Sequence, residues 1–249
     1  MKDHVAFPAD GRGMQEGSLV YRFETPAHPG NILYVNPVHR YQCTNECMHC
    51  GRPSLETEGW RPNIYEQKAG TSLFLDRIPS AEEVRRAISC KIKPDDSEVA
   101  IIGLGEPLIR LPLALDVIRF AKDGYHVSTR VDTNGQAGIM YKSPAVKLAQ
   151  AGLDEARVSV NAINEPEYVA LCRPQFKGAF GKVIEFVHGC IDAGIRTKAS
   201  FVTGFDDGTV KTRSGDDYLE FAASLGIRPD DVILRPYIPP FPATDDHPA

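Results

Sequence analysis

The sequence predicts an α/β fold in which parallel strands alternate with helices. From residue 79 onward, short apolar segments alternate regularly with longer segments of helical periodicity. Turn residues such as Gly103 and Gly135 follow the apolar segments closely. This alternation is typical of βαβ units, whose consecutive strands lie parallel in one sheet. With residues 32–35 counted as the first strand, the repeating series has six strands. That number fits either a doubly wound open sheet or an incomplete barrel.

The part of the chain before residue 79 has a different pattern. Residues 18–23 and 31–36 have the composition of strands and are joined by turn residues, which predicts a short N-terminal hairpin. Residues 51–79 contain glycine, proline and glutamate without a sustained period, so we expect a long loop. Loops of that length are uncommon and often functional, so the segment is either a lid over a site or a mobile insertion.

The remaining elements follow one another in the strand–helix order. Ser80 and Glu83 have the spacing of a capping box, which marks the start of the first helix of the series. The segment Thr133-Asn134-Gly135 ends the third strand in the same way that glycines end the second. The expected helices cover residues 80–90, 112–123, 143–151, 165–171, 179–193 and 215–225, and the expected later strands cover 98–102, 126–132, 155–161, 195–202 and 232–237.

Length and composition indicate one globular domain. The chain has 249 residues, of which 42% are hydrophobic and 24% charged. We expect residues 1–17, rich in glycine and charge, and residues 239–249, rich in proline and aspartate, to be flexible. One domain over residues 18–238 remains, and that length is sufficient to bury a substantial core.

Charge and hydropathy exclude several classes of partner. The formal net charge is −5, which makes binding to nucleic acid unfavourable as a general property of the surface. No apolar run approaches the ~18 residues of a transmembrane helix, so no membrane partner is expected. The first ten residues lack the apolar region of a secretory signal, so we expect a cytoplasmic protein.

Three of the six cysteines share one short segment after the expected strand at 31–36. They form a C-x3-C-x2-C pattern: Cys43, Cys47 and Cys50. In a cytoplasmic chain such a cluster indicates a metal site rather than a disulfide framework. A [4Fe–4S] cluster held by three thiolates leaves one iron open to a small molecule. Zinc is the alternative, but a closed structural zinc site needs four ligands, and only His49 is near enough to add one.

The second strand of the series ends in Gly103-Leu-Gly105-Glu106-Pro107. Ligands of parallel α/β proteins bind at the carboxyl ends of the strands, where glycines expose the backbone. A carboxylate there is suited to an ammonium group. The alternative is an ordinary strand-to-helix turn whose acidic residue is stabilised by the helix dipole.

Polar side chains alternate with apolar ones along two later strands. Arg130 and Asp132 occupy one side of the third strand, and Arg157, Ser159 and Asn161 occupy one side of the fourth. Because helices should cover the apolar side, the polar side should face inward. An interior this polar predicts a hollow barrel whose cavity is filled by a ligand. The alternative is that these are edge strands with one solvent-exposed face.

The same alternation suggests the charge of a substrate. Arg130 on the third strand, Lys198 on the fifth and Arg235 on the sixth would all face the interior. Buried cations need anionic partners. We therefore expect an anionic substrate with a carboxylate or phosphate near Arg130 and Arg235. The alternative is a structural ion pair at the rim of the barrel.

The cysteine triplet and the Gly-x-Gly-Glu-Pro segment together resemble the radical S-adenosylmethionine (SAM) superfamily. Several phrases look most like the small TatD-associated radical SAM proteins, and next like glycyl-radical-enzyme activases: NILYVN, CTNECMHCGR, DTNG, SVNA, LCRP and RPY. The resemblance covers residues 18–238. It implies a partial (β/α)6 TIM-like barrel of parallel strands with outer helices, in addition to the N-terminal hairpin.

The resemblance also implies a function. A [4Fe–4S] cluster on the three cysteines would cleave SAM reductively to methionine and a 5′-deoxyadenosyl radical, which abstracts hydrogen from a substrate that the sequence does not identify. An electron donor such as flavodoxin or ferredoxin is the implied partner. The alternatives are a glycyl-radical-enzyme activase and a non-catalytic iron–sulfur or zinc protein.

Residue by residue, the resemblance implies seven positions near SAM: His49, Gly103, Gly105, Glu106, Asn134, Ser159 and Asn161. The segment from Gly103 to Glu106 would receive the SAM ammonium, Ser159 and Asn161 the ribose hydroxyls, and the backbone at His49 the adenine. The chain departs from the family pattern at Leu104, which replaces the second glycine of G-G-E-P, and at His49, where an apolar or aromatic residue is usual.

Overall fold

The fold is seen in a computed structural model of the chain, which describes residues 19–23, 31–52 and 64–239. Within these residues, seven strands form one sheet, in the spatial order in which they occur in the chain. The strands are β1 (Val20–Tyr21), β2 (Ile32–Val35), β3 (Glu98–Ile101), β4 (Ser128–Thr133), β5 (Glu155–Ser159), β6 (Arg196–Thr203) and β7 (Val232–Pro236). The expected flexible segments at the two ends lie outside the described residues, apart from Pro239.

The pairing of the strands confirms both predicted parts of the sheet. β1 pairs antiparallel with β2, with Val20 opposite Val35, and forms the N-terminal hairpin. The other five pairings are all parallel, from β2–β3 to β6–β7. Because β1 and β7 lie at opposite ends of the strand order, the parallel strands make an open, partial barrel rather than a closed one.

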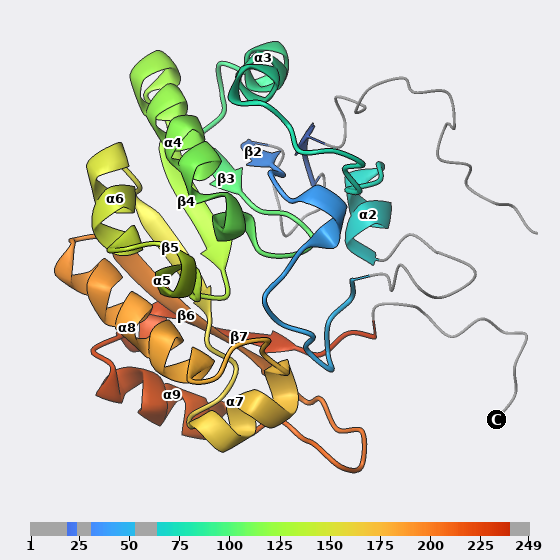
Figure 1. Ribbon diagram of the computed structural model, residues 1–249, viewed down its shortest axis with the longest axis vertical. Coiled ribbons are helices and arrows are strands. Elements are labelled where there is room, and N and C mark those ends of the chain that lie inside the picture. Colours follow the sequence, from blue (N-terminus) through green and yellow to red (C-terminus); the bar gives the residue numbers. More distant parts are fainter. Residues whose placement is uncertain (1–18, 24–30, 53–63, 240–249) are drawn as a thin grey trace, which may run out of the picture.

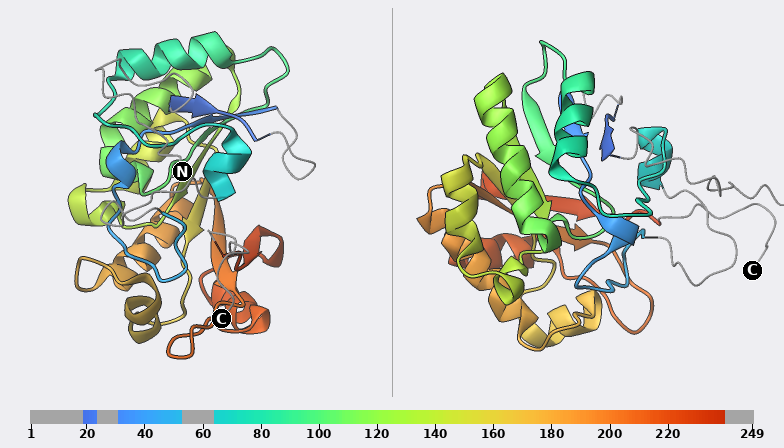
Figure 2. Two further views of the ribbon diagram at one scale, coloured as in Figure 1. Left: turned by 90° about the vertical axis from the view of Figure 1, so that its right-hand side faces the viewer. Right: turned by 45° about the horizontal axis from the view of Figure 1, so that its top comes forward.

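The helices connect the parallel strands, as the sequence predicts. They are α2 (Ile64–Ala69), α3 (Ala81–Lys91), α4 (Leu111–Tyr125), α5 (Ala137–Met140), α6 (Pro144–Ala151), α7 (Glu165–Cys172), α8 (Ala179–Asp192) and α9 (Gly215–Ser224). Short 3-10 turns lie at His39–Tyr41, Pro107–Arg110 and Pro229–Asp231. The capping box is present, because Ser80 accepts from the Glu83 backbone and Glu83 accepts from the Ser80 backbone. Figures 1 and 2 show α4, α6, α8 and α9 along one side of the strands.

The expectation of a loop without secondary structure over residues 51–79 is wrong for its described part, where α2 forms. Glu66 on α2 is buried, and its carboxylate accepts hydrogen bonds from the Tyr41 hydroxyl at 2.7 Å and the Leu73 backbone at 2.8 Å. The polar composition concealed this helix because the side chain that fixes it is a satisfied buried glutamate, not an apolar stripe.

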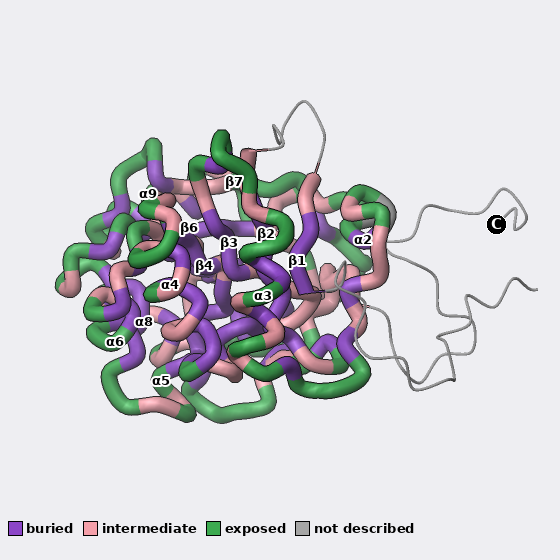
Figure 3. Tube along the Cα trace, turned by 90° about the horizontal axis from the view of Figure 1, so that it is seen from above, coloured by how far each residue is buried: buried purple, intermediate pink, exposed green. Residues whose placement is uncertain are grey.

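The two faces of the sheet differ in chemistry. Val99, Val131, Val158 and Phe201 point to the outer face and are fully buried in the main apolar core. The helices α3, α4, α8 and α9 pack against the strands there. The opposite, inner face carries the polar side chains, as predicted from the alternation along β4 and β5. Figure 3 shows the strands largely buried at the centre of the fold.

Candidate metal centre and active site

The segment that carries the three cysteines follows β2 and is docked onto the end of α7. The backbone of Glu46 donates to the carbonyls of Cys172 and Arg173 at 3.1 and 3.2 Å, and the backbone of Met48 donates to Leu171 at 3.0 Å. The backbone of Cys50 then donates to Cys47 at 3.0 Å, which closes the loop between the second and third cysteines. We refer to residues 43–50 as the cysteine loop.

Two of the three sulfurs accept hydrogen bonds from nitrogen donors. The backbone of Asn45 lies 3.4 Å from Cys43 Sγ, and Asn134 Nδ2 lies 3.6 Å from the same sulfur. Arg52 Nε lies 3.4 Å from Cys50 Sγ. None of the three cysteines is in a disulfide, and all are partly exposed. Hydrogen bonds of this kind favour the thiolate, which is the form that binds a metal.

Arg52 is a residue of the candidate site that the sequence reasoning missed. Besides Cys50, its guanidinium donates to the Tyr41 carbonyl at 2.9 Å and to the Asn45 carbonyl, so it joins the two sides of the cysteine loop. Burial would lower the pKa of Arg52, but the thiolates of the triplet raise it. The only local signal was a cation two residues after the third cysteine.

The thiols fit an iron–sulfur cluster in kind, because thiolates are the usual ligands of iron in such clusters. The neighbouring Cys172 and burial raise the pKa of the Cys47 thiol, and burial raises the pKa of the Cys43 thiol to about 12. In these side-chain positions, no three His, Cys, Asp or Glu side chains of the described residues lie close enough together to hold one metal ion. The cysteine side chains must therefore rearrange for three soft thiolate ligands to meet. Cluster binding would release the thiol protons.

A buried polar network connects the cysteine loop to its neighbours. Gln136 Nε2 donates to Asn45 Oδ1 at 2.6 Å and to the Tyr168 hydroxyl at 2.8 Å, and Asn45 Nδ2 donates to the same hydroxyl at 3.0 Å. Asn134 Nδ2 also donates to Thr44 Oγ1 at 2.8 Å. The turn after β4 and the helix α7 thus hold the loop by side-chain contacts that no local pattern in the sequence revealed.

The glycines after β3 have a packing role. A Cβ on Gly103 would lie 2.2 Å from Asn36 Oδ1, and a Cβ on Gly105 would lie 2.3 Å from the Gln42 carbonyl. Gly105 also has a φ of +133°, which favours glycine. The backbone of Glu106 donates to the Gln42 carbonyl at 2.8 Å. The turn therefore lies directly against the backbone that leads into Cys43.

The carboxylate of Glu106 is engaged by the chain itself. It is buried and accepts hydrogen bonds from Leu108 N at 2.8 Å, Thr133 Oγ1 at 2.7 Å and Asn134 N at 2.6 Å. Burial raises the pKa of Glu106 to about 7, although these hydrogen bonds lower it. Glu106 thus fixes Asn134, whose side chain contacts the cysteine loop.

The other expected SAM residues lie at or beyond the ends of the strands. Ser159 Oγ lies 3.5 Å from Ser200 Oγ on the neighbouring strand β6. Asn161, with a φ of +59°, is buried, and its Oδ1 accepts from the Val202 backbone at 3.1 Å. The ring of His49 packs edge-on against Phe205, and burial lowers its pKa to about 4. His49 Nδ1 is buried without a hydrogen-bond partner in the described part of the chain.

The two arginines expected near a substrate converge on one carboxylate but differ in their surroundings. Arg130 is 2% exposed and is paired with Glu98 at 2.7 Å and with Asp132. Arg130 therefore fits the alternative given above, a structural ion pair. Arg235 reaches Asp132 at 3.5 Å and keeps 44% of its side chain exposed. Because β5 and β6 lie between β4 and β7, this contact requires the sheet to curve inward.

Comparisons with known proteins identify the family of the chain. The sequence model of the radical SAM superfamily matches residues 38–213. A protein of Saccharolobus islandicus named as a probable GTP 3′,8-cyclase is 30% identical over 189 residues, which are 74% of this chain and 51% of that protein. The chain therefore spans about half the length of this curated relative.

Solved structures share the fold at low sequence identity. Streptococcus suis SuiB bound to S-adenosylmethionine matches with a TM-score of 0.53 and 18% identity, over 84% of this chain and 40% of that one. The protein anSMEcpe with bound AdoMet matches with a TM-score of 0.59 and 12% identity, over 86% of this chain and 53% of that one. These likenesses support the partial barrel. The family match covers well over half of the chain, including the cysteine triplet, and the chain belongs to the radical SAM superfamily.

Proposed function

We propose that the chain is a radical SAM enzyme in which Cys43, Cys47 and Cys50 hold a [4Fe–4S] cluster and SAM binds beside it. Together these groups supply the one-electron cleavage of SAM to methionine and a 5′-deoxyadenosyl radical, which takes hydrogen from a substrate. The observation that carries this proposal is a loop of three unpaired cysteines, two of whose sulfurs accept N–H hydrogen bonds, in a member of this superfamily.

The residues of the chain have separate tasks in this proposal. Arg52 and Asn134 hold the cysteine loop in shape through the hydrogen bonds described above. The turn at Gly103–Glu106 forms the wall nearest the SAM ammonium. Ser159 and Asn161, at the end of β5, would face the ribose, and His49 would lie beside the adenine.

The proposal extends to partners and location. The matched curated relatives are named for action on GTP, but the match covers only 51% of the first of them, so we leave the substrate open here. A reduced flavodoxin or ferredoxin is the proposed electron donor, and the cytoplasm is the proposed location. Among the described helices, none has the length and hydropathy needed to cross a membrane.

Anaerobic reconstitution with iron and sulfide tests the proposal. The wild-type chain should acquire the visible absorbance of an iron–sulfur cluster, and dithionite with SAM should then yield 5′-deoxyadenosine and methionine. Cys43→Ala, Cys47→Ala and Cys50→Ala should each lose both the iron and the product, because thiolates are the ligands.

Cys90→Ser and Cys190→Ser are the matched controls, since these cysteines lie on α3 and α8, away from the loop. Both should keep wild-type iron content. Loss of iron in Cys90→Ser would mean that the site is misassigned. A chain that binds a cluster, or zinc, but never yields 5′-deoxyadenosine would instead be a non-catalytic metal protein.

A further inference from the structure

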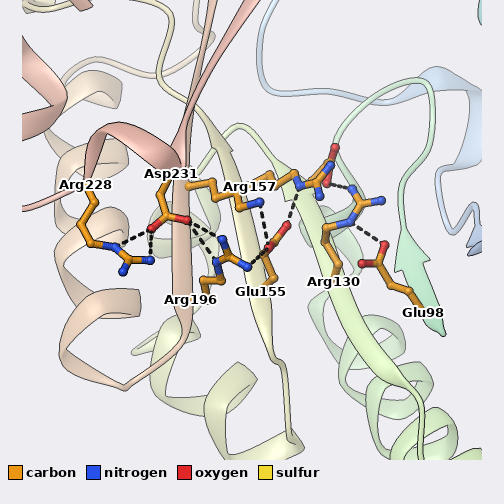
Figure 4. Close-up of polar contacts among 9 residues, drawn as sticks. Glu98, Arg130, Glu155, Arg157, Arg196, Arg228 and Asp231 are labelled. Atoms are coloured by element: carbon orange, nitrogen blue, oxygen red, sulfur yellow. Dashed lines mark hydrogen bonds and ion pairs between the residues drawn. The ribbon is translucent and has the colours of Figure 1, made fainter. Parts of the chain in front are cut away.

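A series of ion pairs, in two separate groups, crosses the inner face of the sheet. Arg130 on β4 is paired with Glu98 on β3 and with Asp132. Further along, Glu155 on β5 accepts from Arg157 Nε at 2.6 Å and lies 3.2 Å from Lys198 Nζ. Figure 4 shows both groups, one around Arg130 and Glu98 and the other from Glu155 through Arg196 to Asp231. The series lies on the face opposite the helix-covered core.

The charges in this series do not balance. The carboxylates are Glu98, Asp132, Glu155 and Asp231, and the cations are Arg130, Arg157, Arg196, Lys198, Arg228 and Arg235. Four anions against six cations leave a formal excess of two positive charges, but the side chains of Arg196 and Arg228 are 53% and 72% exposed, so solvent screens their charges. Without these two and Asp231, three carboxylates face four cations, and this excess of one charge on a partly buried surface favours the binding of an anion. SAM does not supply the balance, because its one carboxylate is outnumbered by its ammonium and sulfonium.

Three of the cations are less fully paired with carboxylates and have N–H donors available for a ligand. Arg157 uses only Nε, for Glu155, so its two terminal nitrogens make no hydrogen bond within the described residues, and its side chain is 27% exposed. Arg235 has one contact, at 3.5 Å, and Lys198 shares the single carboxylate of Glu155 with two arginines. Arg130, in contrast, is paired with two carboxylates, Glu98 and Asp132, the second of which it shares with Arg235.

The register brings these three cations to one region. Asp132 on β4 is opposite Arg157 on β5, and Arg157 is opposite Lys198 on β6. Arg235 reaches the same Asp132 from β7. Ser159 and Ser200 lie two residues further along β5 and β6, toward the strand ends that face the cysteine loop. Arg157 and Lys198 therefore lie deeper in the barrel than the proposed SAM residues, whereas Arg235 is opposite Val202, two residues beyond Ser200, and its guanidinium extends back to Asp132.

We propose that Arg157, Lys198 and Arg235 bind a multiply charged anionic group of the substrate, such as a phosphate or polyphosphate. This inference rests on the proposed function and names the substrate class of the same site. The guanidinium of an arginine can donate two parallel hydrogen bonds to two oxygens of a phosphoryl group, and the ammonium of a lysine adds a compact positive charge. The site is made by strands, so it is preformed rather than assembled by a loop.

Pyrophosphate is the probe, titrated calorimetrically into the reconstituted, desalted protein with SAM present. Wild type should bind pyrophosphate, and Arg157→Gln and Arg235→Gln should each weaken that binding at least tenfold. Neither variant leaves a carboxylate without a cation, because Glu155 remains paired with Lys198 and Arg196, and Asp132 remains paired with Arg130. Arg228→Gln is the matched control: its side chain is 72% exposed, it pairs with Asp231, and its pyrophosphate affinity should stay within threefold of wild type.

Two further readouts make the result decisive. SAM affinity and the formation of 5′-deoxyadenosine without substrate should survive in Arg157→Gln and Arg235→Gln. Unchanged pyrophosphate affinity in both variants, or an equal loss in Arg228→Gln, would overturn the anion site. So would a tenfold loss of SAM affinity without loss of pyrophosphate affinity, because the cations would then serve the SAM carboxylate. Failure of every protein to form 5′-deoxyadenosine would refute the proposed function, while the pyrophosphate comparison would still decide the anion site.

Discussion

The two faces of the sheet differ in their side chains and therefore in their roles. Outward from the sheet, Val131, Val158 and Phe201 are fully buried among apolar neighbours. Inward, the adjacent positions carry charged groups such as Arg130 and Arg157. Buried apolar area stabilises a fold directly, whereas partly buried ion pairs recover little more than their desolvation cost. The outer face therefore accounts for stability, and the inner face is the part of the sheet available for a ligand.

The largest expected difference between the faces lies in two consecutive residues of β6. Phe201 is fully buried and stacks on Tyr218, with ring centroids 4.4 Å apart. Phe201→Ala should lower the free energy of unfolding by about 3–5 kcal/mol, because it removes apolar contacts and leaves a cavity. Urea denaturation of the two proteins measures this difference.

Ser200→Ala is the control on the inner face. Its hydroxyl lies 3.5 Å from Ser159 Oγ, a weak contact, so the loss should stay below about 1 kcal/mol. Equal losses in Phe201→Ala and Ser200→Ala would mean that stability is not concentrated on the outer face.

A smaller effect is expected within the inner face itself, where Arg130 is the exception. Arg130→Met keeps the volume but leaves Glu98 without its cation, so the free energy of unfolding should fall by about 2–3 kcal/mol. Lys198→Met should cost less than about 1 kcal/mol, because Glu155 retains Arg157. Denaturation curves that rank the two variants the other way would show that Arg130 is not the structural member of the series.

The fold was predictable because its signals are local. Apolar strand segments separated by helical ones predicted parallel strands, and the Ser80–Glu83 spacing predicted the start of α3, which the structure confirms. The alternation around Val131 and Val158 correctly assigned the outer face. The cysteine triplet was equally local, so it identified the family before any contact was known.

What the sequence did not reveal depends on contacts between distant segments. Arg52 acts on carbonyls up to eleven residues away, and Gln136 contacts Asn45 across 91 residues. The charge series is another example: the alternation predicted that Arg130 faces inward but not that Glu98 on the neighbouring strand would pair with it. A one-dimensional pattern gives the side of a strand on which a residue lies, not the partner that it meets.

The smallest expected effect is a pH dependence that comes from the inner face. Burial would raise the pKa of Glu155, but the hydrogen bond and charge of Arg157 and the charge of Lys198 hold it below its ordinary value. Arg228 and Arg196 likewise lower the pKa of Asp231, against its burial. A carboxyl whose pKa is lowered by folding adds stability that is complete above its unfolded pKa, about 4 for these groups, and is lost as the pH falls through its folded pKa.

The contribution of these two carboxyl groups to the free energy of unfolding should therefore be level above about pH 5 and should fall as the solution is acidified below about pH 4. Glu155→Gln removes one of the groups responsible, so its curve should decline less steeply between those values than that of wild type. The outer face offers the contrast, because Phe201→Ala removes no titrating group and should lower the whole curve without changing its slope. Urea denaturation at a series of pH values measures all three curves. Parallel curves for wild type and Glu155→Gln would mean that the Glu155 cluster is as screened as an ordinary surface pair, and that the inner face contributes no acid-sensitive stability.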